Sequence, residues 1–186
     1  WLCITLATSH FILLPMGVWA LCQNPDLNTP QTLTTALALG LFFGQISMAT
    51  AHELVHRSDR GLRRLGTAIF TSLWFGHHAS AHPLVHHVWV ASDQDPNSSR
   101  AGEGFYRFCA RAWIGSFRAG FAAETRRRRL RNPRRSWVNH PYFAYACGTV
   151  LTGLGAWAIG GTKGVITLFL LATFAQMQLL LSDYVQ

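Results

Sequence analysis

The fold is decided by residues 31–57, which read QTLTTALALGLFFGQISMATAHELVHR. Residues 31–51 carry no charged side chain, and about 20 apolar residues, at a rise of ~1.5 Å each, are enough to cross a bilayer. The apolar run ends at two histidines, His52 and His56. If the helix continues, these side chains share one face, because residues four apart lie next to each other. The stretch therefore predicts a membrane span that ends in a metal-chelating pair.

Three further apolar runs have the length of a span, at roughly 1–22, 142–162 and 164–182. The link NPDLNTP between the first two spans is rich in turn residues, and the link GGTKG between the last two is very short. We therefore expect an all-α fold, a polytopic integral membrane helical bundle. Two transmembrane hairpins flank a helical histidine-box region in it.

The expected single domain, 1–186, has three parts. Residues 1–56 form a transmembrane hairpin that ends in the first histidine box, 57–141 hold the second box, and 142–186 form the other hairpin. The chain begins without methionine inside one apolar run and stops just after another, so we expect an internal fragment of a longer protein. The first run lacks the basic start and cleavage site of a signal peptide, which favours a span.

The charge pattern predicts the orientation. The chain is 49% hydrophobic, its mean hydropathy is +0.17 and its net charge is +8. All fifteen arginines lie between Arg57 and Arg135. Basic residues next to spans favour the cytoplasm, so the middle region is expected on the cytoplasmic side of a bacterial inner membrane.

Arginines among aromatics also occur in nucleic-acid-binding proteins. Beside four apolar runs, however, a positive-inside loop explains them, and we expect no nucleic-acid partner.

Two stretches of the middle region are expected to lie against the bundle or the membrane surface. Residues 65–76 are apolar but too short to span. Residues 104–129 alternate aromatic side chains with arginines, which is typical of an interfacial helix with a basic face. Four scattered cysteines without C-x-x-C spacing indicate neither a disulfide framework nor a zinc ribbon.

A second histidine group, HPLVHH, spans residues 82–87. His82 and His86 repeat the four-residue spacing, while His87 turns ~100° away around a helix, so this box could serve two metal ions. Proline is best tolerated in a first helical turn, and Pro83 therefore predicts that His82 sits just outside the helix.

The two groups together predict a metal site. A single H-x-x-x-H arises easily by chance, but five imidazoles on one side of one membrane are costly unless functional. The expected ligands are His52, His56, His82, His86 and His87. Imidazole suits iron, zinc and copper alike, which leaves the metal open. The first group also matches the H-E-x-x-H zinc-protease pattern with Glu53 as general base. That reading leaves the second group unexplained, and the surplus of histidines favours two metal ions.

The boxes and their surroundings resemble the membrane alkane 1-monooxygenases of the fatty acid desaturase/hydroxylase superfamily. In that family H-E-L-x-H-[RK] is followed by H-x-x-x-H-H and then by V-A-T-x-x-D-P-x-x-S-R-x-G-E. Here the last motif is carried by Val90-Ala91-Ser92, Asp95-Pro96, Ser99-Arg100 and Gly102-Glu103. The resemblance covers nearly the whole chain. The departures are Ala81, Pro83, Trp89 and Ser92, and they remove no histidine, so the metal assignment that the resemblance implies is unchanged.

This resemblance implies a histidine-ligated, non-haem di-iron centre of two Fe that uses O2 to hydroxylate the terminal carbon of medium- or long-chain alkanes. It also implies rubredoxin, with rubredoxin reductase, as electron donor and alkane substrate arriving from the lipid bilayer. Residues 182–186 resemble the start of the family's N-Y-I-E-H motif, whose histidine would follow Gln186. Five box ligands make a partial set, so we expect residues 1–186 alone to be inactive.

Three alternatives remain beside the zinc protease. A membrane fatty-acid desaturase or hydroxylase shares the di-iron chemistry, although the run after the second box argues against it. An arylalkane methyl hydroxylase of the xylene-monooxygenase type is closer, and only substrate profiling separates it. A non-catalytic membrane scaffold is disfavoured by the intact boxes.

Acidic residues near the boxes are expected to orient histidine N–H groups. The candidates are Glu53, Asp95 and Glu103, although Asp95 also begins an ordinary turn signal, Asp-Pro-Asn. Two further histidines, His77 and His78, could line the cavity, but they lie outside the boxes and are expected to be structural. His10 and His140 are expected to be incidental.

Overall fold

The computed structural model describes residues 1–132, 134 and 136–185. Arg135 and Gln186, which closed the predicted basic run and the predicted last motif, lie outside the described residues. Every regular element among the described residues is helical, which confirms the all-α expectation. In chain order these are α1 (Leu2–Gln23), α2 (Thr29–Leu41), the π-helix η1 (Phe42–Ser47), α3 (Met48–Val55), α4 (Arg60–Ser72), α5 (His78–Ala81), the π-helix η2 (His82–His86), α6 (His87–Trp89), α7 (Phe105–Arg131), the 3-10 helix η3 (Trp137–Asn139) and α8 (Pro141–Val185).

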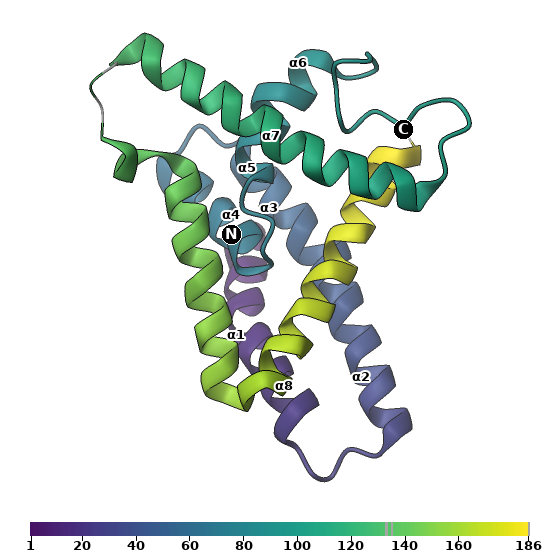
Figure 1. Ribbon diagram of the computed structural model, residues 1–186. Helices are drawn as coiled ribbons and strands as arrows, with labels where there is room; N and C mark the ends of the chain where they lie inside the picture. Colours follow the sequence, from purple (N-terminus) through teal and green to yellow (C-terminus); the bar gives the residue numbers. More distant parts are fainter. Residues whose placement is uncertain (133, 135, 186) are drawn as a thin grey trace.

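Three helices among the described residues are long and apolar enough to cross a membrane, namely Leu2–Gln23, Thr29–Val55 and Pro141–Val185. The last contains both predicted C-terminal spans, which Gly160 and Gly161 separate. Gly161 has φ 56° and ψ −140°, a conformation that favours a residue without Cβ. Figure 1 shows the two arms of α8 meeting at this bend, as the GGTKG link predicted.

The second span is built from α2, η1 and α3 in direct succession. Asn28 caps its start, since its side chain accepts the backbone N–H of Gln31 while the Gln31 side chain accepts that of Asn28. The helix ends at Val55 with His56 as its C-terminal cap, and the first box therefore lies at the end of a span, as predicted. The π-helical turn at Phe42–Ser47 has no counterpart in the sequence-based expectations.

The predicted apolar stretch 65–76 packs on the bundle through α4. Gly66 makes this contact close, because a Cβ there would lie 2.7 Å from the carbonyl oxygen of Ala51 and 2.8 Å from the Cβ of Leu54. The buried core continues from α3 and α4 toward α8 and α7. Its largest fully buried side chains are Phe43, Met48, Phe70, Phe75 and Phe108.

The second histidine box differs from the prediction. Residues 78–89 are helical throughout, so His82 lies inside a helix rather than just outside it. The physical reason is the π-turn η2, which has Pro83 at its second position. A π-turn bonds residues five apart, and this change from the α-helical pattern falls where Pro83 offers no backbone donor.

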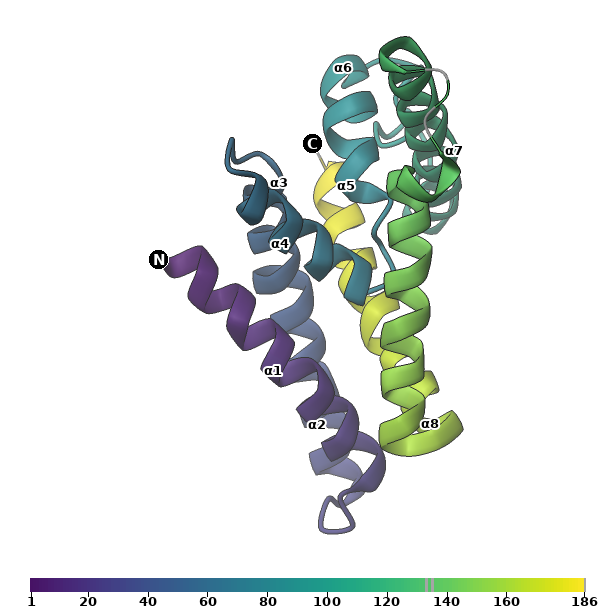
Figure 2. The same ribbon diagram turned by 90° about the vertical axis from the view of Figure 1, so that its left-hand side faces the viewer.

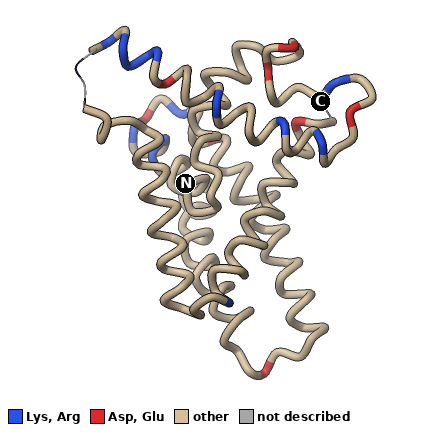
Figure 3. Tube along the Cα trace, in the orientation of Figure 1, with Lys and Arg blue, Asp and Glu red and all other residues tan. Residues whose placement is uncertain are grey.

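Both histidine boxes lie at the same end of the bundle. In Figure 1 α7 crosses above the spans at this end, while the α1–α2 link and the bend of α8 lie at the other. The view in Figure 2 places α3 and α4 beside α5, with α7 over the arms of α8. Nearly all described arginines gather at this same end (Figure 3). The single helix α7 confirms the helix expected over 104–129.

We predict that Gly66→Ala destabilises the fold by about 1–3 kcal/mol, because the added methyl group has to displace backbone or Cβ atoms of α3. Thermal unfolding of the purified protein in detergent measures the loss. Gly155→Ala is the matched control, since a Cβ there meets nothing within 4 Å. An unfolding temperature equally unaffected in both variants would contradict close α3–α4 packing.

Candidate metal centre

Four histidines from three helical segments point their ring nitrogens at one place. His82 Nε2 lies 2.7 Å from His52 Nε2, 3.1 Å from His56 Nε2 and 2.8 Å from His87 Nε2. The potential ligand atoms of all four lie within 4.8 Å of one another. His52 and His56 come from the end of α3, His82 begins η2, and His87 begins α6.

This arrangement suits a cation better than a hydrogen-bond network. A neutral imidazole nitrogen either donates or accepts, so His82 Nε2 cannot hydrogen-bond three other nitrogens at once. A metal ion would accept the lone pairs of all four rings. Burial, followed by the neighbouring histidines, lowers the pKa of His82, and burial also lowers that of His87. Both rings are therefore held in the neutral form that binds metal.

The π-turn decides which residues of the second box meet. Its backbone bond joins His87 N–H to the carbonyl of His82, five residues earlier. His87 therefore reaches His82, and both join the first box. His86, expected to chelate together with His82, stacks on His82 with ring centroids 5.2 Å apart but lies outside the four-histidine group.

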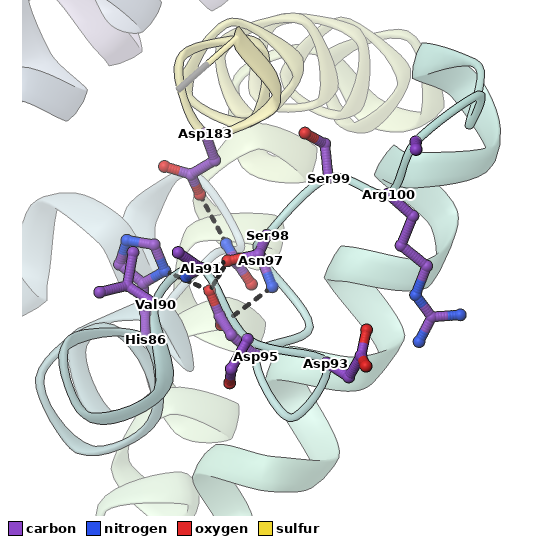
Figure 4. Close-up of a pocket in the computed structure, with 12 residues that line it drawn as sticks. His86, Val90, Ala91, Asp93, Asp95, Asn97, Ser98, Ser99, Arg100 and Asp183 are labelled. Atoms are coloured by element: carbon purple, nitrogen blue, oxygen red, sulfur yellow. Dashed lines mark hydrogen bonds and ion pairs between the residues drawn. The ribbon is translucent and has the colours of Figure 1, made fainter.

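His86 instead has a carboxylate partner. Its Nδ1 lies 2.8 Å from Asp95 Oδ2, and Asp95 is 2% exposed (Figure 4). The hydrogen bond to Asp95 raises the pKa of His86. Although burial alone raises the pKa of Asp95, its bonds to His86, Ser98 and the backbone N–H of Asn97 hold that pKa below the usual value. Asp95 thus lies where a residue that orients a histidine would lie, and it also forms the predicted turn.

A cavity of about 380 Å³ lies beside the four-histidine group. Its lining includes His52, His78, His82, His86, His87, Gln178, Ser182 and Asp183. A second cavity, of about 700 Å³, also has His86 in its lining (Figure 4). Asp183 lines both cavities and accepts a hydrogen bond from Asn97 Nδ2 at 2.6 Å. Asp183 was absent from the predicted site, although it lies in the last motif that resembled the family.

The other two acids contact arginines rather than histidines. Glu53 pairs with Arg57 at the surface. Glu103 accepts from Arg111 Nε at 2.8 Å and Nη2 at 2.5 Å. Charge-assisted pairs with arginine are among the strongest available to a carboxylate, which explains both departures from the expected orienting role. Glu103 therefore ties the loop after the second box to α7.

Three other histidines have structural surroundings. His77 is buried between aromatic rings and lies 3.3 Å from Ser116 Oγ. Burial lowers the pKa of His77 to about 3. His10 Nε2 lies 2.7 Å from Ser72 Oγ, and His140 Nε2 lies 3.2 Å from Thr125 Oγ1. None of the three is among the residues that line the cavity beside the four-histidine group.

Comparison with known proteins finds one matching protein family and several similar proteins. The model of the fatty acid desaturase family matches residues 28–186. Alkane 1-monooxygenase 1 of Alcanivorax borkumensis is 30% identical over 118 residues, which are 63% of this chain and 29% of that protein. Alkane 1-monooxygenase of Ectopseudomonas oleovorans is 26% identical over 177 residues, which are 95% of this chain and 44% of that protein.

A third relative has a name that refers to aromatic substrates rather than alkanes. The xylene/toluene monooxygenase hydroxylase component XylM of Pseudomonas putida is 27% identical over 150 residues, covering 77% of this chain and 39% of that protein. The chain spans less than half the length of these curated relatives.

We predict that Asp95→Asn weakens metal binding about 10–100-fold, because the amide cannot hold His86 as the carboxylate does. Metal per chain after a chelator challenge measures the change. The exposed Asp93 supplies the control variant Asp93→Asn, which should keep its metal. Equal retention in both variants would refute the orienting role of Asp95.

A pH-dependent stability is predicted for Glu103. Its hydrogen bonds from Arg111 lower its pKa to about 2, from an ordinary 4.5. A carboxyl with a lowered folded-state pKa stabilises the fold above its unfolded value, and this contribution is lost as pH falls from 4.5 toward 2. The difference in unfolding temperature between wild type and Glu103→Gln should therefore be greatest above pH 5 and shrink toward pH 2.

The control for this measurement is Glu53→Gln, which breaks an exposed pair and should change stability little at any pH. A loss of bound metal in Glu103→Gln without a loss of stability would instead support the histidine-orienting role first expected for this residue.

Proposed function

This chain belongs to the fatty acid desaturase family, and from that premise we propose that the complete protein is a membrane di-iron monooxygenase that converts medium- or long-chain alkanes to 1-alkanols. The observation that carries the proposal is the convergence of four histidine Nε2 atoms at the end of apolar helices. Curated relatives at 26–36% identity, named alkane 1-monooxygenases, support the alkane as substrate.

The described residues fit iron as a partial ligand set. In this proposal His52, His56, His82 and His87 hold one iron, and His86, oriented by Asp95, serves a second. Reduced iron in this centre supplies the activation of dioxygen that aliphatic C–H hydroxylation requires. The protein contributes imidazole rings that stacking and hydrogen bonding hold in place. Its apolar helices give an alkyl chain a route from the bilayer.

The same proposal places the histidine end of the bundle at the cytoplasm, because arginines gather there. A soluble electron donor, expected to be rubredoxin with its reductase, would then reach the metal centre from the aqueous side. The exposed arginines near the end of α7, Arg126, Arg127, Arg129 and Arg131, offer a positive surface that can steer a small acidic donor.

One alternative substrate class is favoured by a specific observation. The relative XylM bears a name that includes xylene and toluene, so hydroxylation of an aromatic methyl group is the second candidate. The zinc-protease reading is not favoured, because Glu53 pairs with Arg57 at the surface and does not line the histidine cavity.

The test is expression of the complete gene product with rubredoxin and its reductase, followed by assays on octane, hexadecane and p-xylene. We predict 1-alkanol product, two irons per chain, and loss of alcohol formation in His86→Ala with unchanged membrane insertion. Gas chromatography, metal analysis and membrane fractionation measure the three outcomes.

His10→Phe is the matched control, because His10 is a buried histidine away from the cavity and packs on Phe11 and Phe43. Oxidation of p-xylene alone would transfer the assignment to the arylalkane class. One zinc per chain, with proteolysis and no oxygen uptake, would refute an oxygenase.

A further inference from the structure

His78, a histidine outside both boxes, faces the centre. It begins α5 and lines the same cavity as the box histidines. The residue is 1% exposed, and its Nδ1 has no hydrogen-bond partner among the described residues. A buried polar atom without a partner costs free energy, so its presence needs an explanation.

The surroundings of His78 would suit a hydrocarbon ring. Its imidazole stacks on Phe75 at a centroid distance of 4.9 Å and meets the Phe70 ring at 5.0 Å. A phenylalanine would pack here without any unpaired nitrogen. A histidine at this position calls for a partner for its ring nitrogens, and the cavity that His78 lines is a place where such a partner can lie.

The ring also continues an array of histidines. His78 stacks on His82 at 5.1 Å with 24° between the ring planes, and His82 stacks on His86 at 5.2 Å with 23°. Three imidazoles thus recur at four-residue intervals along α5 and η2. The stacking fixes the orientation of His78, as a metal site requires of its ligands.

We propose that His78 is a further histidine of the metal centre, which presents a neutral imidazole nitrogen to a metal ion in the cavity lined by His52, His82, His86 and His87. The inference rests on the proposed iron centre. Two-metal sites place their ions about 3.5–4 Å apart, so a second ion lies beside the four-histidine group, where this cavity is. His78 lies outside that group and would serve the second ion.

The test uses the complete gene product, purified in detergent, freed of metal and titrated anaerobically with Fe(II). The variant is His78→Phe, which keeps the ring packing. We expect its iron affinity to fall at least tenfold and X-ray absorption to count fewer histidine nitrogens per iron. We expect the metal-free variant to unfold at the wild-type temperature or above, because the unpaired nitrogen is gone. The rise in unfolding temperature on adding Fe(II) should be smaller.

His10→Phe is again the matched control, since His10 Nδ1 is also buried without a partner but does not line the cavity. Its iron affinity should equal that of the wild type. His78→Leu repeats the measurement if the phenylalanine variant does not insert. Unchanged iron affinity, with or without a lower metal-free unfolding temperature, would overturn the proposal and leave His78 a packing residue.

The iron readout separates this inference from the alkane assignment. Wild type that binds iron but oxidises no alkane overturns the alkane function, while the His78 variants are still judged by iron affinity. Wild type that oxidises alkane while His78→Phe keeps its full iron affinity overturns the His78 assignment alone. Wild type that binds no iron overturns both.

Discussion

Four imidazole nitrogens, from His52, His56, His82 and His87, are held within 4.8 Å of one another, and the packing of the other helices has to keep them there. Neutral lone pairs brought this close gain nothing from one another, and His82 Nε2 has more neighbours than hydrogen bonds it can form. Only packing elsewhere can hold the rings there. The second span supplies His52 and His56, and the helical run from α5 to α6 supplies His82 and His87. Packing of the bundle therefore offsets the cost of holding the four rings together, and a bound cation would relieve that cost.

The loop after the second box supports this centre from outside. Arg111, on α7, donates to the carbonyls of Pro96 and Ser98 at 2.9 Å each while it also pairs with Glu103. These bonds hold the loop that carries Asp95 against His86. Part of the basic character of α7 is thus structural rather than a consequence of membrane topology, and the guanidinium fork suits both carbonyl and carboxylate partners.

Much of this could be predicted from local patterns. Apolar length predicted the spans, the GGTKG link predicted the bend of α8, and the H-E-x-x-H spacing predicted that His52 and His56 share a face. The predicted family is confirmed by the match over residues 28–186. The partners of the second box could not be predicted, because an α-turn and a π-turn differ by one residue in register. That difference exchanges His86 for His87 in the four-histidine group.

Composition and short-range spacing are enough to predict the apolar helices, the clustering of arginines and the two histidine boxes. Which side chains meet depends on how the helices pack. Packing pairs Glu53 with Arg57 and Glu103 with Arg111, and it places Asp95 against His86. It also buries His78 beside the box histidines, where its Nδ1 has no hydrogen-bond partner among the described residues. Such contacts join residues from separate helices, and their geometry is set by packing rather than by position along one helix.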